Sequence, residues 1–531
     1  MESSKLIYMY QPYSTNNHRS DSALRGTAIA LVMAVCLFVN VPSFQAWASS
    51  VRIEARQSGN GTAIQGLKAA AKGDWARAQR LIARARNKDA TRLYHWLRYI
   101  SDAPDAPVAR MQAYVRNHKG FPDLDQIRIN IEARLEEDSK SQEILHWFDD
   151  YHPLTSRGMR LYLDALQSSG RDQDFQPELR GWWAKALMSP KDQQRFLMRY
   201  GGHLRKSDHV KRLDHLLRAD HYTNADRLAR LLGRDYIALA QARKALARQS
   251  PGVDAAIARV PAALKNDPGL MFERLRWRRR HDLNDRAIQI LQNPPAYEDM
   301  AAPAAWWRER HIIIRRLIAE KSYAKAYALA ATHKQRDGLP LAQAEWLAGW
   351  LALQRLEKAH EAFFHFHTLH RKTSTPISRA RAAYWAGRAA QVLGQETVST
   401  AWLKSAAQHA HTFYGQKARI TLGPAKRPAW PEGSLKTGGQ STPRMDDPLD
   451  DPRLRLAELA AHAELNYSAS AFLRAAGGDT QTAADYHALA AFANRLGYPQ
   501  DAVRLAKTAA RKGHHFPDLA YPVRQTHVGA G

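Results

Sequence analysis

Residues 72–78 read KGDWARA and residues 320–326 read EKSYAKA, and each stretch separates two segments whose apolar residues recur three or four positions apart. Residues 283–286 (LNDR) form a third stretch of this kind. Glycine, asparagine, aspartate and serine favour turns, whereas apolar residues three and four positions apart predict one buried helix face. These stretches therefore predict the turns of helical hairpins.

Small residues follow two of these turns. Ala78 comes three residues after Trp75, and Ala324 and Ala326 follow Tyr323. Small side chains let two helices approach closely, so we expect these alanines to lie between paired helices. Such hairpins bury their apolar faces only by stacking on neighbours. We therefore predict an all-α fold: a superhelical solenoid of helical hairpins, a tetratricopeptide-like ring or horseshoe, with a small C-terminal helical domain.

Two changes in composition divide the chain. Residues 423–452 are crowded with proline, glycine, serine and charged residues, which do not form a packed helix. We interpret them as a linker between a helical-repeat domain at 49–422 and a small helical domain at 453–531. Within the small domain, the spacing predicts about three helices, at 454–465, 482–497 and 499–513.

The first residues predict export. The apolar stretch at 27–39 (TAIALVMAVCLFV) is too short for a comfortable membrane span, and Ala46-Trp47-Ala48 has the pattern of a cleavage site. We interpret residues 1–48 as a signal peptide cleaved after Ala48, which predicts a periplasmic protein; an uncleaved anchor is the alternative. Cys36, the only cysteine, lies in this segment, so the mature chain has no disulfide or thiolate metal site.

The chain is strongly basic, with 78 Lys and Arg against 51 Asp and Glu and a net charge of +27. Residues 1–48 contain three basic and two acidic residues, a net charge of +1, so the mature chain keeps +26. Such a field attracts polyanions. For an exported protein these are peptidoglycan peptides and phosphate-bearing polymers or lipids. Nucleic acid is the other standard partner of a basic protein, but export disfavours it and the sequence carries no nucleic-acid-binding motif.

Two further segments resemble a known family. Residues 378–389 (SRARAAYWAGRA) and 412–418 (TFYGQKA) are similar to the helical scaffold of soluble lytic murein transglycosylases, bacterial enzymes that cut the glycan strands of peptidoglycan. Earlier segments resemble successive hairpins of that scaffold in the same order, namely 75–97, 147–166, 208–217, 275–291, 306–317 and 345–353. The resemblance implies a ring or horseshoe of helices, a linker helical domain, and peptidoglycan as the partner.

The resemblance also implies catalytic motifs that this sequence lacks. In the family, a glutamate in a Glu-Ser pair protonates the glycosidic oxygen, and a Gly-Leu-Met-Gln turn follows it. Here the only such pair is Glu2-Ser3, ahead of the apolar stretch, and Gly-Leu-Met-Gln does not occur. Residues 514–525 resemble the approach to the catalytic domain, and only THVGAG follows. We therefore expect that domain to be absent, and we predict no catalytic, cofactor-binding or metal-binding residue and no cofactor.

Three functions are compatible with this pattern. The favoured one is the noncatalytic scaffold portion of a periplasmic soluble lytic murein transglycosylase, inactive alone. The alternatives are a stand-alone periplasmic peptidoglycan-binding or scaffold protein, and an enzyme with an unrecognised site. The expected partners are peptidoglycan and a separately encoded catalytic domain; nucleic acid and stable membrane insertion are not expected.

Tryptophans and arginines admit a further binding role, because aromatic faces stack on sugars and guanidinium groups hold carboxylates. The groups are Trp182-Trp183, Trp306-Trp307 and residues 277–280 (WRRR). We favour packing: one tryptophan of each pair lies between helices and its neighbour at the rim.

Histidines and paired aspartates are weaker candidates. His365, His367 and His370 suggest a metal site, and the last two share a helix face, but no carboxylate stands at ligand spacing. Side chains of adjacent residues in Asp149-Asp150 point apart on a helix, so a helix end explains them better than a catalytic pair. The remaining pairs lack the glycine and glutamate of a calcium loop and are interpreted as a solvated loop; they are Asp446-Asp447 and Asp450-Asp451.

Overall fold

The computed structural model describes residues 60–522 except 102, 104, 137–139 and 427–449. Every regular element in these residues is a helix, which confirms the predicted all-α fold. The predicted signal peptide lies outside the described residues. The first helices, up to residue 200, are α2 (Asn60–Ala71), α3 (Trp75–Ala85), α4 (Lys88–Ile100), α5 (Val108–Asn117), α6 (Leu124–Arg134), α7 (Ser141–Phe148), α8 (Ser156–Ser168), α9 (Asp172–Lys185) and α10 (Pro190–Tyr200).

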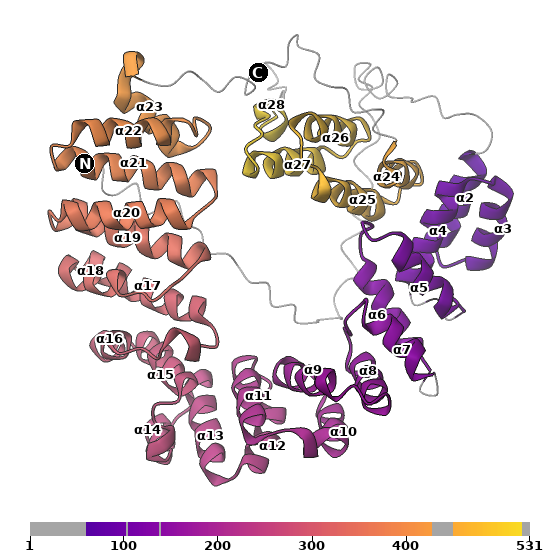
Figure 1. The fold of residues 1–531 in the computed structure, drawn as a ribbon, viewed down its shortest axis with the longest axis horizontal. Coiled ribbons are helices and arrows are strands. Elements are labelled where there is room, and N and C mark those ends of the chain that lie inside the picture. The colour runs from indigo at the N-terminus through magenta and orange to yellow at the C-terminus, as the bar shows by residue number, and fades with distance from the viewer. Residues whose placement is uncertain (1–59, 102, 104, 137–139, 427–449, 523–531) are drawn as a thin grey trace, which may run out of the picture. The chain divides into compact units, whose positions relative to one another are not determined.

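The helices that follow continue the same succession (Figure 1). Up to residue 426 they are α11 (Lys206–Arg218), α12 (Tyr222–Leu232), α13 (Arg234–Arg248), α14 (Val253–Ala258), α15 (Pro268–Arg280), α16 (Asn284–Gln292), α17 (Pro303–Ala319), α18 (Tyr323–Ala331), α19 (Gly338–Arg355), α20 (Ala359–Lys372), α21 (Pro376–Val392), α22 (Glu396–Ala407) and α23 (Phe413–Lys426). The last group is α24 (Pro452–His462), α25 (Asn466–Asp479), α26 (Ala483–Arg495), α27 (Pro499–Arg511) and α28 (Pro517–Ala520).

Each predicted turn contains one residue in the left-handed backbone conformation. These residues are Gly73 (φ 78°), Asp282 (φ 56°) and Lys321 (φ 59°). A backbone N–H beyond this residue returns to the preceding helix, as from Ser322 to the carbonyl of Leu317 at 2.8 Å. This arrangement satisfies carbonyls that a helix end leaves unpaired. The turns are confirmed, although the one expected at 283–286 lies at 281–283, because residue 284 already begins α16.

Small residues lie where the two helices of a hairpin meet. Ala78 and Ala326 are completely buried, as predicted. The fourth residue of the second helix is buried and small in other hairpins as well, namely Ala225, Ala287, Ala362, Ser399, Ala469 and Ala502. Ala324 is exposed, so its predicted interhelical position was wrong. Two residues of separation turn the side chain by about 200° around the helix, away from the partner.

From α15 to α23, each helix packs mainly on its neighbours in the chain (Figure 1), which confirms the predicted solenoid of helical hairpins. Glycines lie at the closest approaches of these helices. A Cβ atom at Gly349 of α19 would lie 2.6 Å from the Phe366 ring of α20, and one at Gly387 of α21 would lie 2.9 Å from Leu403 of α22. The glycines quoted in the family-like segments therefore serve helix packing.

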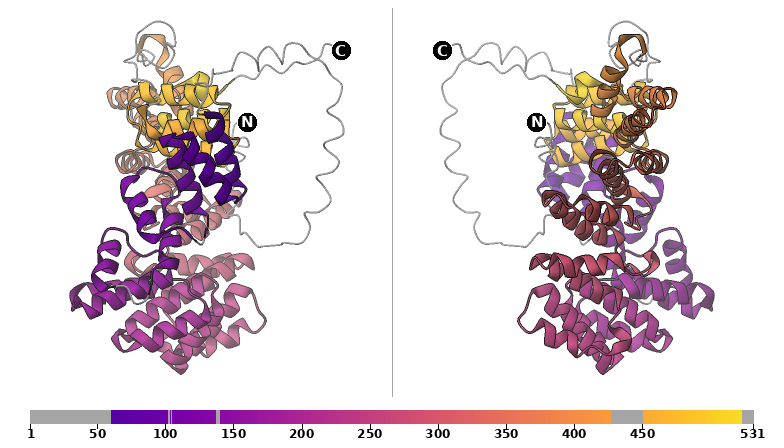
Figure 2. Two further views of the ribbon diagram at one scale, coloured as in Figure 1. Left: turned by 90° about the vertical axis from the view of Figure 1, so that its right-hand side faces the viewer. Right: turned by 90° about the vertical axis from the view of Figure 1, so that its left-hand side faces the viewer.

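The C-terminal helices share a core with the first hairpins, and Figures 1 and 2 show them side by side. Phe472 of α25 packs on Trp96 of α4 and on Phe121, with ring centroids 5.1 and 5.2 Å apart. The guanidinium of Arg455 in α24 pairs with Asp89 of α4 at 2.8 Å. Two segments separated by more than three hundred residues thus complete one apolar cluster.

The C-terminal region contains one more long helix than the sequence predicted. The missed helix is α25, NYSASAFLRAAGGD, whose serines, glycines and small alanines gave a weak periodic signal. Three of its four alanines and Phe472 are nevertheless buried. Helix α23 continues to Lys426 across a non-helical Gly423, four residues into the predicted linker. Residues 427–449 lie outside the described part, so the domain boundaries stay predictions. Among the described helices, none combines the length and apolar composition needed to cross a membrane.

Candidate functional site: an aromatic–arginine stripe

Aromatic rings and guanidinium groups alternate across α19, α21 and the start of α23. We call this surface the aromatic–arginine stripe, and it consists of Tyr323, Trp346, Trp350, Arg355, Arg381, Trp385 and Tyr414. Most of its members come from the first helix of successive hairpins, so the repeat of the fold places them next to one another.

Helical spacing explains the alignment within each helix. Trp346 and Trp350 stand four residues apart on α19, as do Arg381 and Trp385 on α21, and residues at this spacing lie on one helix face. The two indole rings on α19 lie 6.3 Å apart at an interplanar angle of 24°. Neighbouring helices then bring the two pairs together.

Guanidinium groups connect the rings. Arg355 lies over both Tyr323 and Trp350, with 5.1 and 5.2 Å from its Cζ atom to the ring centroids. Arg381 lies 5.2 Å from the centroid of Trp346. These distances fall within the range of cation–π attraction, which fixes each arginine against an aromatic face.

The arginines of the stripe have no acidic partner within the described residues. Neither Arg355 nor Arg381 forms an ion pair there, and Arg355 is exposed. The Nε atom of Arg381 and the indole nitrogen of Trp346 are buried without a hydrogen-bond partner. Burial raises the pKa of Tyr414, and the nearby positive charge of Arg381 opposes this effect.

The stripe therefore offers two complementary kinds of binding group. Aromatic faces can stack on the apolar faces of sugar rings. Guanidinium groups without a protein partner can hold carboxylates through paired hydrogen bonds. Together they suit an anionic glycan.

The tryptophan pairs singled out in the sequence are mainly packing residues. Trp183 is completely buried under Arg212, whereas Trp182 is half-buried at the edge of the core, which matches the preferred interpretation. Trp306 and Trp307 are both buried, so the expected rim position is wrong for the second pair. Both have partners within the fold, because Trp306 packs on Phe272 and the indole of Trp307 donates to Gln343 at 2.9 Å.

In the run at 277–280, two arginines bond to other parts of the fold and the tryptophan is partly exposed. Arg279 pairs with the buried Glu309 at 2.6 Å, and Arg278 donates to the carbonyl of Arg286 at 2.7 Å. Trp277 is half-buried and lines a cavity.

The three histidines do not form one cluster. His365 is buried and its Nδ1 atom bonds to Glu345 at 2.6 Å. His367 and His370 both face the Trp402 ring, so the prediction that they share a helix face is confirmed. Within the described residues, no group of three His, Cys, Asp or Glu side chains is arranged to hold a metal ion. Sequence spacing missed Glu345, because it lies on the preceding helix, twenty residues away.

The aspartate pairs have structural roles where the structure describes them. Asp149 and Asp150 directly follow α7, as predicted, and Asp149 accepts a hydrogen bond from Arg171 at 2.8 Å. Asp451 caps α24 by accepting from the backbone N–H of Arg453 at 2.8 Å. Asp446-Asp447 lies outside the described residues.

The buried carboxylates of the described residues are already engaged. Glu132, for example, accepts hydrogen bonds from the backbone of Leu154 and Thr155 at 2.8 and 2.7 Å. The others, each with a hydrogen-bond or ion-pair partner, are Asp208, Glu273, Glu309, Glu345 and Asp501.

The stripe was not predicted from the sequence. Five of its seven members lie in segments quoted for family resemblance, at 345–353, 378–389 and 412–418, whereas Tyr323 and Arg355 lie outside them. The signal in the sequence was the four-residue spacing of tryptophan and arginine side chains in two segments that form α19 and α21. This spacing predicts a shared surface only if the two helices are known to be neighbours, and the periodicity within one helix does not show which helices lie side by side.

Comparison with solved structures shows a related fold. The chain is similar to an inactive mutant of the lytic transglycosylase Slt from Pseudomonas aeruginosa, with a TM-score of 0.61 and 18% identity over 89% of this chain and 73% of that chain. The 70 kDa soluble lytic transglycosylase from Escherichia coli matches over the same shares at 13% identity and a TM-score of 0.47. No protein-family profile matches the sequence, and no curated protein is significantly similar to it. The related fold rests on the Pseudomonas aeruginosa structure, because the TM-score of the Escherichia coli structure is below 0.5.

Proposed function

We propose that this chain is the noncatalytic helical scaffold of a soluble lytic murein transglycosylase and that it binds the anionic glycan strands of peptidoglycan. The fold shared with the Pseudomonas aeruginosa lytic transglycosylase supports the family. The noncatalytic part of the proposal rests on the sequence expectation alone, since the Gly-Leu-Met-Gln segment that the resemblance implies for a catalytic domain does not occur in the 531 residues.

The aromatic–arginine stripe is the observation that carries the binding proposal. Peptidoglycan combines sugar rings with the carboxylates of its lactyl groups and peptides, which are the groups that such a surface can bind. The net charge of +26 after removal of residues 1–48 adds long-range attraction. Exposed charge pairs are each worth only about 0 to 1 kcal/mol, so many weak contacts must act together.

The proposed location is the periplasm, after removal of residues 1–48. Amino-terminal sequencing of the exported protein should begin at Ser49; an intact 27–39 segment in the membrane fraction would instead indicate an anchor. A stand-alone peptidoglycan-binding scaffold is the second candidate. An adjacent reading frame that encodes Glu-Ser and Gly-Leu-Met-Gln would favour the first candidate, with the catalytic domain as a separate polypeptide.

Sedimentation with purified murein sacculi tests the binding proposal. Residues 49–531 should co-sediment at 0.1 M salt and be released at 1 M, because the screening length falls from about 10 Å to about 3 Å. Arg355→Ala should lower the affinity by up to about fivefold, since a charge pair at an exposed site contributes at most about 1 kcal/mol. The supernatant should contain no anhydromuropeptides.

Arg84→Ala is the matched control, because it removes one exposed arginine from α3, far along the chain from the stripe. It should change the affinity less than twofold, as expected for a single screened surface charge. Equal losses for both variants would assign binding to net charge rather than to the stripe. A failure of the wild-type chain to sediment at low salt would remove the peptidoglycan-binding proposal.

A further inference from the structure

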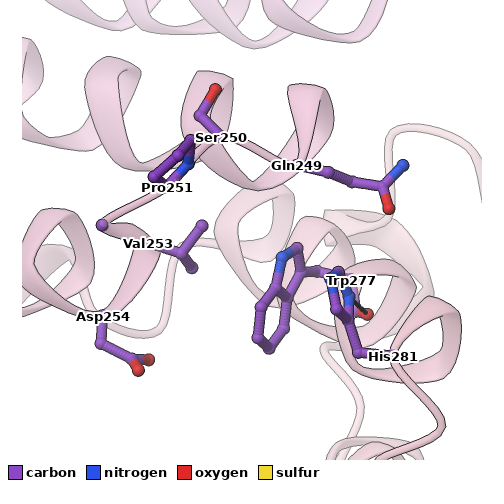
Figure 3. Close-up of a pocket in the computed structure, with 8 residues that line it drawn as sticks. Gln249, Ser250, Pro251, Val253, Asp254, Trp277 and His281 are labelled. Carbon is purple, nitrogen blue, oxygen red and sulfur yellow. Dashed lines mark hydrogen bonds between the residues drawn. The ribbon is translucent and has the colours of Figure 1, made fainter.

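A cavity of about 380 Å³ lies beside the carboxyl-terminal end of α15, outside the aromatic–arginine stripe. Its walls come from the turn between α13 and α14, from the first turn of α14, and from Trp277 and His281 (Figure 3). Ligand pockets in proteins usually occupy about 300 to 1,000 Å³, so the volume suits one or two sugar rings.

An aromatic platform forms one wall of the cavity. The Trp277 indole lies between the His281 ring and the turn that carries Val253 and Asp254 (Figure 3). The rings of Trp277 and His281 are stacked with centroids 4.1 Å apart. The Nδ1 atom of His281 lies 2.9 Å from the carbonyl oxygen of Trp277, which fixes the ring behind the indole. The His281 ring thus holds the Trp277 indole in place, and both rings line the cavity.

Polar side chains surround this platform. Gln249, Ser250 and Asp254 line the cavity and offer an amide, a hydroxyl and a carboxylate. None of the three side chains forms a hydrogen bond or an ion pair within the described residues. Gln249 has a left-handed backbone (φ 55°), and the N–H of Ser250 bonds to the carbonyl of Ala245 at 2.9 Å, so the turn that presents them is defined.

We propose that this cavity is a binding subsite for an uncharged N-acetylhexosamine ring, with Trp277 as the stacking platform and Gln249, Ser250 and Asp254 as hydrogen-bonding groups. An indole face covers the apolar face of a pyranose ring. Amide, hydroxyl and carboxylate side chains match its hydroxyl and acetamido groups, which both donate and accept. This subsite would add a specific sugar contact to the proposed function. It rests on the proposed function only in taking peptidoglycan as the source of the sugar.

A tetramer of N-acetylglucosamine is the probe, because it carries no charge. Isothermal titration calorimetry of residues 49–531 should show binding whose affinity changes less than twofold between 0.1 and 1 M salt, since screening acts only on charges. Trp277→Ala should lower the affinity for the tetramer about tenfold. Trp277→Phe should lower it far less, because a phenyl ring keeps a stacking face. Arg84→Ala on α3 should leave the affinity for the tetramer unchanged.

Fluorine NMR of the chain labelled with 5-fluorotryptophan locates the probe without relying on a destabilising variant. Trp277→Phe identifies one resonance by its loss, and that resonance should shift when the tetramer is added to the wild-type chain. A shift confined to other tryptophans, or no binding by the folded wild-type chain, would overturn the subsite. Sacculus binding without tetramer binding would reject this proposal alone, whereas tetramer binding without sacculus binding would reject the proposed function.

Discussion

Two histidines, His365 on α20 and His333 in the segment between α18 and α19, bond to the carboxylate of one buried residue, Glu345. His365 lies 2.6 Å from Oε2, and Nε2 of His333 lies 3.2 Å from Oε1. The other ring nitrogen of His333 accepts from the backbone N–H of Gln335 at 2.8 Å, so its proton resides on Nε2 and is donated to Glu345. Burial by itself would raise the pKa of Glu345, but the two histidines outweigh it and hold the pKa at about 2, against an ordinary 4.5.

The lowered pKa of Glu345 predicts a pH dependence of stability. A carboxyl group whose pKa is lower in the folded state stabilises the fold above its unfolded pKa and loses that contribution as the pH falls towards its folded pKa. Glu345→Gln should cost about 1.5 to 3 kcal/mol in free energy of unfolding at pH 7. The difference from wild type should shrink between about pH 4.5 and pH 2, as measured by urea unfolding.

Glu396→Gln is the control for this pH series, because Glu396 is exposed on α22. It should change the free energy of unfolding by less than about 0.5 kcal/mol at any pH. A constant difference between wild type and Glu345→Gln across the range would show that the charge of Glu345 does not stabilise the fold.

At the scale of the element, the helical hairpin was the part that local sequence predicted best. Its turn residues and its small interhelical residue lie within a few positions of one another, as in the stretch from Lys321 to Ala326. Local sequence did not predict α25, because its serines and glycines weaken the apolar periodicity of its buried face. It also misplaced Ala324, because a residue two positions from Ala326 points away from the partner helix.

Two alanines of α18 allow a matched test of hairpin packing. Ala326→Leu places extra volume between α17 and α18, which should lower the free energy of unfolding by about 1 to 3 kcal/mol. Ala324→Leu adds the same atoms on the exposed face and should change it by less than about 0.5 kcal/mol. Chemical denaturation of both variants gives the comparison, and equal costs would contradict the assigned packing.

At the scale of the whole molecule, the described chain makes contacts that local sequence patterns do not predict. The turn stretches and the small residues that follow them predicted the solenoid, but the contact between Arg455 and Asp89 joins residues 366 positions apart. His411, after α22, likewise stacks on His515, before α28, with centroids 3.4 Å apart. The stripe and the Trp277 cavity share this property, because each needs side chains from helices or turns that only the folded chain brings together.

The shared core predicts that the C-terminal helices stay attached after the chain is cut. A site for a specific protease placed between residues 427 and 449 should yield two fragments that co-elute in gel filtration. Phe472→Ala should weaken this association, since removal of a buried phenyl ring costs about 3 to 5 kcal/mol. Phe364→Ala removes an exposed phenyl ring of α20, outside the shared core, and serves as the control. Immediate separation of the wild-type fragments would contradict the shared core.

The shared core also delays the completion of the first hairpins, because their packing partners are synthesised last. A ribosome adds about 5 to 20 residues per second, so the 366 positions between Asp89 and Arg455 correspond to a delay of roughly 20 to 70 seconds. During this interval the apolar surface around Trp96 has no Phe472 to cover it. The first hairpins to be made are therefore among the last to be completed.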